Sequence, residues 1–377
     1  MSQGQVLDAS ILMHFASLED PRDNRGKEHL LLDIITISIC AVLSGAEGWE
    51  DIAEYGSAKQ EWLSTFLPLP NGIPCADTFA RVFARLEEQQ LQKCFGSWVK
   101  AISNLVAGDN VGIDGKTLRH SYDKSKDEAA IHLVSAWACR NRLVLGQCQV
   151  KNKSNEISAI PELLKVLALS GCIVTIDAMG CQKEIATAIV EQQADYVLAL
   201  KGNQGSLFED VQWLFNQAQS VEFAGITHDF IRTVDKGHGR IEIRQCWTLS
   251  DLTYLTQKPL WAGLQSVAMV HSERRIGGSV STETRYFISS RPGNASEIAQ
   301  AVRDHWQIEN SLHWVLDVSF REDSCRIRSG YAAQNMALLR HIALNLLGQD
   351  KSTGRSIAAK RKRAGWDQAY LVKILTQ

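Results

Sequence analysis

The chain has 377 residues, of which 45% are hydrophobic and 22% are charged, so its composition is that of a folded protein and not of a disordered one. Its 40 Lys and Arg residues nearly balance its 42 Asp and Glu residues, so a surface that binds a polyanion must come from local charge separation. The nine cysteines form no C-x-x-C pair, which argues against a zinc module and a disulfide framework and favours a reducing cytoplasm. We expect no secretory signal and no membrane partner, because the longest apolar run, Leu30 to Leu43, is too short to cross a bilayer.

Residues 1–106 are predicted to form an all-helical N-terminal domain. Helical periodicity, interrupted by prolines and glycines, marks the segments Val6–Ser17, Leu30–Ser44, Trp49–Phe66, Ala76–Leu86 and Gln90–Val106. In the short segment from Ala76 to Leu86 the apolar residues form one stripe, whereas Arg81 and Arg85 point elsewhere. This segment is either the recognition helix of a helix-turn-helix unit, with its arginines on DNA, or an amphipathic helix whose arginines are only solvated.

From Asn110 the pattern changes to strands that alternate with helices. The predicted strands are Asn110–Asp114, Ile131–Ala138, Leu143–Lys151, Cys172–Asp177 and Asp195–Leu200, and the predicted helices are about Ile157–Leu169 and Lys183–Gln193. The order of these elements is three strands followed by a helix, a strand, a helix and a strand. This is the order found in a ribonuclease-H-like mixed sheet. The predicted fold class is therefore α/β, with this sheet preceded by the helical domain.

A second domain is predicted to span residues 107–350 and to carry a β-rich insertion at about 207–290, where alternating segments follow one another. After the insertion, one long amphipathic helix runs from Ala295 to about Phe320, and another covers Tyr331–Leu347. Residues 351–377 are predicted to be a basic C-terminal tail, since Lys351 to Arg363 contains six Lys or Arg residues and no acid. This tail either adds salt-sensitive affinity for phosphates or is simply solvated.

Two strands of the predicted sheet end in an acid. Asp114 follows the first strand in GIDGKT, and Asp177 follows the fourth strand in TIDAMG. Asp114 either belongs to a functional site or only caps the turn that follows it. If the two strands are neighbours, both acids emerge at the sheet edge where α/β folds bind ligands, and two nearby carboxylates repel unless a cation lies between them. Oxygen ligands of this kind select Mg²⁺ or Mn²⁺, and a third carboxylate would complete a two-metal site for displacement at phosphorus.

The third carboxylate is predicted to be Glu309 on the long helix. A polar stripe with a spacing of four residues is formed by His305, Glu309, His313 and Asp317. Such a stripe is usually a solvated face, but here it is flanked by tryptophans and opposes a buried sheet, which favours a site. The same spacing allows a zinc site on His305, Glu309 and His313, although the two aspartates match a hard cation better.

Seven stretches add to these residues and are spread over nearly the whole chain. They are LEDPRDNRGKEHLLLDI, GIDGKTLRHS, TIDAMGCQ, DYVLALKGNQ, HGRIEIR, RDHWQIENSLHWVLDVSFRED and NMALLRHIALNLL. Together they resemble the H-repeat-associated family of bacterial insertion-sequence transposases, which carry a DDE catalytic domain of ribonuclease-H-like fold. The resemblance implies that Asp114, Asp177 and Glu309 hold two Mg²⁺ or Mn²⁺ ions, with Asp114 as the shared ligand. The β-rich stretch would be the insertion that many such transposases carry between the second Asp and the Glu.

The resemblance implies a DNA transposase that cleaves and joins phosphodiester bonds at the ends of an insertion sequence. Its partners would be double-stranded DNA, as terminal inverted repeats and as target, and a second copy of the chain in a homodimer on DNA. Related transposases have a Tyr, an Arg and a Lys where this chain has Val302, His305 and Leu316, so their DNA-end contacts are not carried over. Candidate DNA contacts, with plain surface charge as the alternative for each, are Arg81, Arg85, Lys116, Arg119, Lys201, Arg240 and Arg303.

Two other functions fit the same sequence. A DNA-binding remnant without catalytic activity would use the helical domain as a binding module. A ribonuclease-H-like nuclease of repair or recombination would cleave DNA without preference for element ends. Binding to the inverted repeats, measured together with strand cleavage in Mg²⁺, separates these functions.

Overall fold

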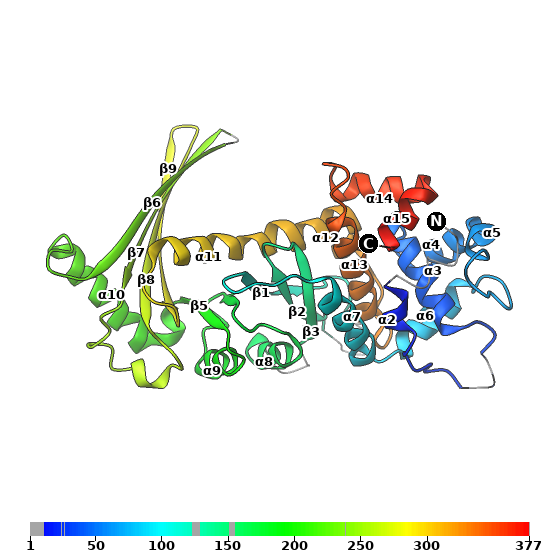
Figure 1. Ribbon diagram of the computed structural model, residues 1–377, viewed down its shortest axis with the longest axis horizontal. Coiled ribbons are helices and arrows are strands. Elements are labelled where there is room, and N and C mark those ends of the chain that lie inside the picture. Colours follow the sequence, from blue (N-terminus) through cyan, green and yellow to red (C-terminus); the bar gives the residue numbers. More distant parts are fainter. Residues whose placement is uncertain are drawn as a thin grey trace.

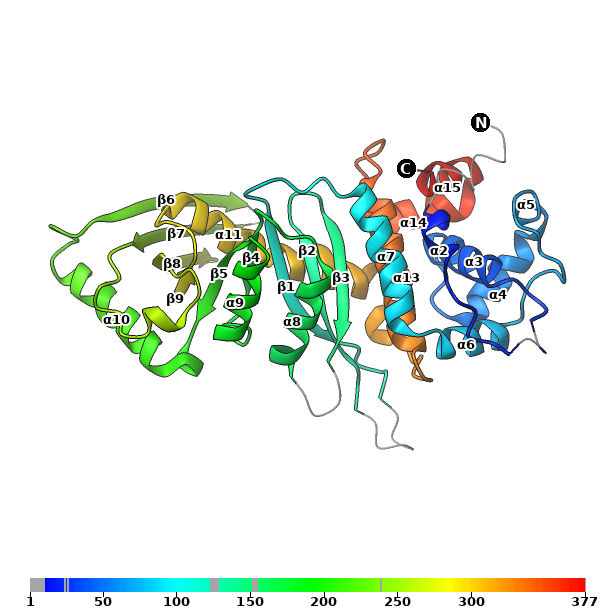
Figure 2. The same cartoon turned by 60° about the horizontal axis from the view of Figure 1, so that its bottom comes forward.

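The computed structural model describes residues 11–23, 25, 27–122, 129–150, 155–237 and 239–376. The first part of the predicted helix at Val6–Ser17, and His238 of the HGRIEIR stretch, lie outside the described residues. The molecule is elongated, with the N-terminal helices at one end, the strands of the insertion at the other and the rest of the sheet between them (Figures 1 and 2). Across the described ranges, no helix has both the length and the apolar character needed to cross a membrane.

The N-terminal region is helical, as the periodicity predicts. Its helices are α2 (Leu12–Phe15), α3 (Leu31–Leu43), α4 (Trp49–Ala58), α5 (Gln60–Leu63), α6 (Ala76–Arg85) and α7 (Glu88–Ile102). Helix α3 is buried from Asp33 to Leu43, which explains why its sequence is almost continuously apolar. Helix α6 buries Phe79, Val82 and Phe83 on one face, as the predicted stripe requires.

The central sheet begins with three antiparallel strands and continues with two parallel ones. The strands are β1 (Asn110–Thr117), β2 (His132–Ala138), β3 (Leu143–Gln149), β4 (Ile173–Ile176) and β5 (Asp195–Leu200), and the helices between them are α8 (Glu156–Val166) and α9 (Lys183–Glu191). Their order in the sheet is β3-β2-β1-β4-β5, with β1, β4 and β5 parallel to one another. The predicted ribonuclease-H-like mixed sheet is therefore confirmed.

The β-rich insertion extends this sheet and does not form a sheet of its own. Its elements are η2 (Gly202–Gln204), α10 (Gly205–Ser220), β6 (His228–Gly237), β7 (Arg240–Leu249), η3 (Lys258–Leu260), β8 (Ser266–Ile276) and β9 (Ser279–Ser289). Strand β9 pairs with β5 in antiparallel fashion, which gives one nine-stranded sheet with the order β3-β2-β1-β4-β5-β9-β8-β7-β6. The tips of these outer strands project past the long helix α11 (Figure 1).

One long helical rod crosses the sheet on the face opposite to α8 and α9 (Figure 1). It consists of α11 (Ala295–Gln307), a π-helical segment η4 (Ile308–His313) and α12 (Trp314–Phe320), so the predicted helix is continuous but changes its winding in the middle. After the short η5 (Glu322–Ser324), α13 (Ala332–Gln349) contacts β3 on one side and α3, α6 and α7 on the other. Helix α13 therefore joins the sheet to the N-terminal helices.

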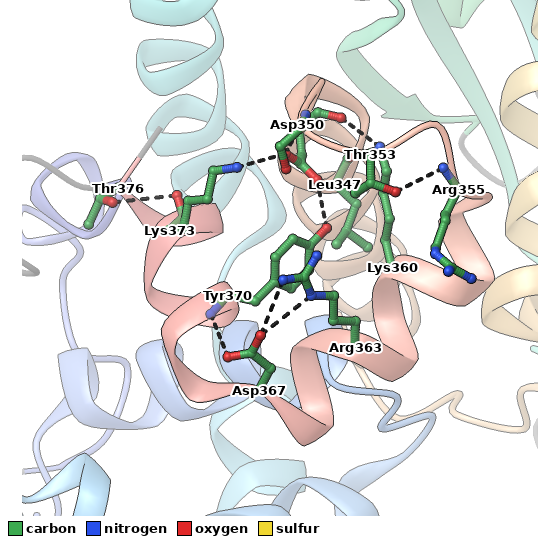
Figure 3. Close-up of polar contacts among 11 residues, drawn as sticks. Leu347, Asp350, Thr353, Arg355, Lys360, Arg363, Asp367, Tyr370, Lys373 and Thr376 are labelled. Carbon is green, nitrogen blue, oxygen red and sulfur yellow. Dashed lines mark hydrogen bonds and ion pairs between the residues drawn. The ribbon is translucent and has the colours of Figure 1, made fainter.

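The basic C-terminal stretch is folded and is not the tail that we predicted from its charge. It forms α14 (Ile357–Trp366) and α15 (Gln368–Leu375), which pack together and against α13. Lys360 is buried and donates to the backbone carbonyls of Leu347 and Asp350, at 2.9 and 2.7 Å. The carboxylate of Asp350 accepts from the Tyr370 hydroxyl at 2.8 Å (Figure 3). Part of the basic charge of this stretch therefore holds the fold and is not free to meet phosphates.

Candidate active site

Asp114 and Asp177 emerge side by side from two parallel strands. The register between β1 and β4 ends at the pair Ile113 and Ile176, and each strand places its aspartate at the next residue. Strand β1 then continues to Thr117 in its pairing with β2, so Asp114 lies where β4 stops and not at the exit of its own strand, as we predicted. The parallel pairing of β1 with β4 thus brings the two acids side by side, at the point where β4 ends.

Asp114 lies in an environment that opposes its charge. Its side chain is 22% exposed. Burial, together with the negative charges of Asp177, Glu156 and Glu309, raises the pKa of Asp114 from 3.8 to about 7, although the backbone N–H of Gly115 works in the other direction. The charges of three other carboxylates therefore act on Asp114, and a cation bound beside it would stabilise its charged form.

Asp177 is held rigidly by the turn that follows it. Its Oδ1 accepts from the backbone N–H groups of Met179 and Gly180, at 3.0 and 3.2 Å. This is the turn-capping role that we weighed for Asp114, found instead at the second aspartate. In the described part of the chain no hydrogen bond is made by the other oxygen, Oδ2, which is the atom left for a ligand.

Glu309 is an exposed residue in the π-helical segment of the rod. Segments of π-helix are rare and occur often at functional sites. Glu309 lines a cleft of about 820 Å³ between the rod and the outer strands, together with Arg240, Arg303 and Trp306. The guanidinium of Arg285 lies over the Trp306 ring in this cleft, 4.9 Å from the ring centroid. The third predicted carboxylate is therefore accessible to a large ligand.

The alternative zinc ligands diverge in the structure. His305 contacts Thr175 of the sheet, Nδ1 to Oγ1 at 3.1 Å, and His313 contacts Asp114, Nδ1 to Oδ2 at 3.5 Å, whereas Glu309 faces the cleft. Burial lowers the pKa of His305 and lowers that of His313 to about 4, so both imidazoles are neutral at neutral pH.

No group of three or more His, Cys, Asp or Glu side chains is close enough to hold a metal ion, within the residues that the structure describes. Neither the zinc set nor the three predicted acids therefore close around an ion in this conformation. The donor type nevertheless fits a divalent cation, because all three predicted ligands are carboxylates and two of them, Asp114 and Asp177, directly follow the last paired residues of two neighbouring parallel strands.

Lys116 is largely buried and paired with acids of the protein, so it is not available for the DNA contact that we predicted. Its ammonium group contacts the carboxylates of Asp317 and Glu322, the latter at 2.8 Å, and its side chain is 13% exposed. Glu322 is also buried and lies 3.7 Å from the guanidinium of Arg340. This buried ion cluster connects β1, which carries Asp114, with α12 of the rod.

The remaining predicted DNA contacts all lie on the surface, but at several distant places. Arg81 and Arg85 are exposed on α6, and Lys201 is exposed just after β5. Arg119 is 75% exposed and lies 3.2 Å from Asp323.

Two further predicted contacts line the cleft that contains Glu309. Arg240 lies 3.2 Å from Glu242, and Arg303 forms an ion pair with Asp235. Of the three predicted acids, Glu309 lines this cleft with these two arginines, whereas Asp114 and Asp177 are not among its lining residues.

Sequence reasoning missed Glu156 and its partner His132. Their side chains meet next to the backbone of Gly115, with His132 Nε2 at 2.6 Å from Glu156 Oε1. The sequence carries no distinct signal for Glu156, because an acid in the first turn of a helix is an ordinary feature. Gly115 was the available clue, since a glycine inside a strand often marks a close approach of another group.

Comparison with known families decides what kind of protein carries this site. The family model described as a transposase DDE domain matches residues 108–346, and the model of a DDE_Tnp_1-associated domain matches residues 12–99. The chain belongs to the DDE transposase family. The two matches coincide with the sheet and its rod, and with the N-terminal helices.

Individual relatives agree with the family. The chain is similar to the "H repeat-associated putative transposase YhhI" of Escherichia coli (strain K12), at 41% identity over 97% of each chain. The predicted resemblance to the H-repeat-associated transposases is therefore confirmed. The "Inactive transposase YbfQ" of the same strain is 41% identical over 20% of this chain and 89% of its own length.

Among solved structures, the chain is similar to a piggyBac transposase, in a structure described as a synaptic complex with hairpin DNA. The TM-score is 0.42 at 10% identity, over 100% of this chain and 79% of that one. No conclusion about DNA binding rests on a similarity of this size.

Proposed function

We propose that the protein is a DNA transposase that cleaves phosphodiester bonds at the ends of an insertion sequence and transfers the strands to a target. The catalytic residues would be Asp114, Asp177 and Glu309. The observation that carries the proposal is that Asp114 and Asp177 each directly follow the last residue paired between β1 and β4, with the charge of Glu309 in range of Asp114. Membership of the DDE transposase family supports the same assignment.

The three acids would hold two Mg²⁺ or Mn²⁺ ions, with Asp114 as the shared ligand. When bound, such ions supply Lewis-acid activation of the attacking oxygen and stabilise the leaving oxygen of an in-line displacement. Burial, and after it the charges of neighbouring acids, raises the pKa of Asp114, so a cation bound beside this carboxyl would stabilise its ionised form. The preference for a hard cation follows from the all-oxygen donor set.

Other residues of the chain would hold the acids in place. The turn after β4 fixes Asp177 through two backbone N–H groups. Lys116 ties β1 to Asp317 on α12 and so sets the distance between Asp114 and the rod that carries Glu309. His313 packs against Asp114 as a neutral imidazole, which adds no positive charge that would compete with a bound cation.

DNA would reach the site through the cleft beside Glu309. Arg240 and Arg303 line this cleft, and contacts of arginine with phosphates would position a strand there without reading its sequence. The N-terminal helices would recognise the element ends, with Arg81 and Arg85 exposed on α6. Two ends must be joined in one reaction, so we propose a homodimer on DNA.

The test is cleavage of a DNA fragment from the gene's flanks that carries the proposed terminal inverted repeats. Asp114→Asn, Asp177→Asn and Glu309→Gln should each abolish Mg²⁺-dependent cleavage and leave end binding in a gel shift intact. Glu184→Gln, an exposed acid on α9, is the matched control and should cleave like the wild type.

Three results would contradict the proposal. Cleavage that survives Asp114→Asn would exclude the assigned site. End binding by the wild type without any cleavage in Mg²⁺ or Mn²⁺ would identify a DNA-binding remnant. Cleavage that is equally fast on DNA without the repeats would identify a nuclease.

A further inference from the structure

Strand β7 buries an acid at a position where a strand ordinarily buries an apolar residue. From Arg240 to Arg244 charged residues alternate with Ile241 and Ile243, and the charged residues line the cleft on the face that meets the rod. Glu242 is 5% exposed, whereas the two isoleucines beside it are only half-buried. Because a buried charge is costly unless partners compensate it, the reason for this acid must lie in what it contacts.

Glu242 gathers three guanidinium groups. Arg240 Nε and Arg274 Nη2 each lie 3.2 Å from its Oε1, and Arg244 pairs with its Oε2. Arg274 directly faces Glu242 in the register of β7 with β8, and Arg240 and Arg244 are the neighbours of Glu242 on the same face of β7. One buried carboxylate therefore holds arginines from two strands on one surface.

A second carboxylate joins this group to the rod. Asp235 on β6 directly faces Glu242 in the register of β6 with β7. Its Oδ2 accepts from Arg244 at 2.8 Å and also pairs with Arg303 of α11. Two acids directly opposite each other repel, and the guanidinium groups around them compensate this repulsion. Four arginines share two carboxylates, so the group carries excess positive charge. The name guanidinium cluster is used below for Arg240, Arg244, Arg274 and Arg303.

The guanidinium cluster is open to the cleft that contains Glu309. Three of its side chains are about half exposed, namely Arg240 at 47%, Arg274 at 54% and Arg303 at 47%. In the described ranges, Oε1 of Glu242 accepts no hydrogen bond from the two guanidinium groups beside it. The contact is one of charge, and it leaves N–H groups of Arg240 and Arg274 for an anion in the cleft.

We infer that the guanidinium cluster binds the phosphate backbone of DNA and that Glu242 is its positioning residue. This inference rests on the proposed function for the identity of the ligand, and it deepens that function by adding Arg244, Arg274 and the role of Glu242. Arginine presents its N–H groups in a planar fork that matches the oxygens of a phosphate. Glu242 and Asp235 hold these forks in place before DNA arrives, which lowers the entropy lost on binding.

The surroundings of the cluster favour a nucleic acid over a small anion. The cleft has a volume of about 820 Å³ and contains the partly exposed ring of Trp306, over which the guanidinium of Arg285 lies. Grooves that combine basic groups with aromatic rings are typical of proteins that bind nucleic-acid strands. The cluster and Glu309 line the same cleft, so a strand held by the arginines would extend toward the proposed catalytic residue.

The test measures DNA binding by the full-length protein in EDTA, so the result does not depend on metal or on activity. Fluorescence anisotropy of a labelled duplex from the gene's flank is followed at a series of salt concentrations, beside a scrambled duplex of equal length. Arg274→Gln should weaken binding to both duplexes by roughly fivefold at physiological salt and lower the slope of log K against log salt by about one.

Arg275→Gln is the matched control. Arg275 is the next residue of β8 and is 53% exposed, but the alternation of the strand turns it to the other face, and it does not line the cleft. Its substitution removes the same charge from the protein and should leave binding like that of the wild type. A difference between these two variants therefore reports the place of the charge and not its amount.

Glu242→Gln distinguishes a positioning residue from a simple counter-charge. The substitution adds positive charge to the cleft, so a counter-charge would predict tighter binding and a steeper salt dependence. We expect the opposite: the arginines are no longer held, binding weakens by more than about tenfold, and the slope falls by about two. Glu242→Asp keeps the charge and should bind between the wild type and Glu242→Gln. Thermal unfolding shows whether each variant is folded, and the exposed Arg274 keeps the site testable if Glu242→Gln does not fold.

The outcomes separate this inference from the proposed function. Equal binding by Arg274→Gln and Arg275→Gln overturns the phosphate site, and tighter binding by Glu242→Gln overturns the positioning role. Either result leaves the proposed function standing if Asp114→Asn still abolishes cleavage in Mg²⁺. If the wild type binds neither duplex, the proposed function and this inference both fail. Weaker binding by Arg274→Gln and Glu242→Gln, but not by Arg275→Gln, supports the inference whether or not Asp114→Asn abolishes cleavage.

Discussion

The substitution Asp114→Asn should make the metal-free protein more stable at neutral and alkaline pH. In the folded chain, burial and the neighbouring acids raise the pKa of Asp114 to about 7, against an ordinary value of 3.8. A carboxyl with a raised pKa supports the fold below its unfolded pKa, and this support is lost as the pH rises through the folded pKa. The wild type therefore loses stability between about pH 4 and pH 7, and an asparagine at this position does not titrate.

The size of the effect follows from the two pKa values. One pKa unit corresponds to about 1.4 kcal/mol, so a rise from 3.8 to about 7 corresponds to roughly 4 kcal/mol. Relaxation of the surrounding structure in the charged state makes this value an upper bound. We expect Asp114→Asn to raise the free energy of unfolding by up to about 4 kcal/mol above pH 7 and to leave it nearly unchanged near pH 4.

The assay is denaturant unfolding in EDTA at a series of pH values from 4 to 8.5. Asp23→Asn is the control, because Asp23 is an exposed acid of the N-terminal region and its substitution should have little effect. Addition of Mn²⁺ at pH 8 should stabilise the wild type and not Asp114→Asn. Equal stability of the two proteins at pH 8, or a lower stability of Asp114→Asn, would refute the reasoning that Asp114 is held in a repulsive environment.

Three further predictions test other parts of the structure. Lys116→Met leaves the buried Glu322 without its nearest cation, so the free energy of unfolding should fall by about 3–5 kcal/mol; a loss below 1 kcal/mol in urea unfolding would contradict the buried ion cluster. Arg81→Ala with Arg85→Ala should weaken end binding and reduce the slope of log K against log salt by about two, whereas an unchanged slope would place the phosphate contacts elsewhere. Burial alone would raise the pKa of Asp350, but hydrogen bonds from Ser352, Tyr370 and Lys373 outweigh it and lower the pKa. The ionised carboxylate therefore stabilises the fold above about pH 4, and this stabilisation is lost in acid. Asp350→Asn should therefore cost about 1–3 kcal/mol at pH 7 and less at pH 3, and an equal cost at both pH values would contradict this reading.

Most of the sheet could be predicted because its signals are local. Runs of apolar residues, alternating or continuous, marked these strands, and the order of strands and helices indicated a mixed sheet in which β1 and β4 could be neighbours. From that adjacency followed the meeting of Asp114 and Asp177, which the register confirms. The pairing of β9 with β5 was not predictable, because the choice of partner between strands far apart in sequence leaves no mark on local periodicity.

The predictions that failed depended on residues far away in the sequence. Whether a charged side chain is buried, for example, is decided by partners that lie on other elements. Lys116 and Lys360 read as surface cations, but their partners are far along the chain or are backbone carbonyls. The strand was also predicted to stop at Asp114, because Gly115 suggests a turn. Gly115 instead leaves space for the side chain of Glu156, and no pattern within the strand can show this.

The most direct test of the account is a crystal structure of the protein soaked in Mn²⁺, with the ions located by anomalous scattering. The account predicts two ions at the edge formed by β1 and β4, both bound by Asp114, with Asp177 and Glu309 each contacting one of them. A single ion on His305 and His313, or no ion within reach of Asp114 at saturating Mn²⁺, would contradict it.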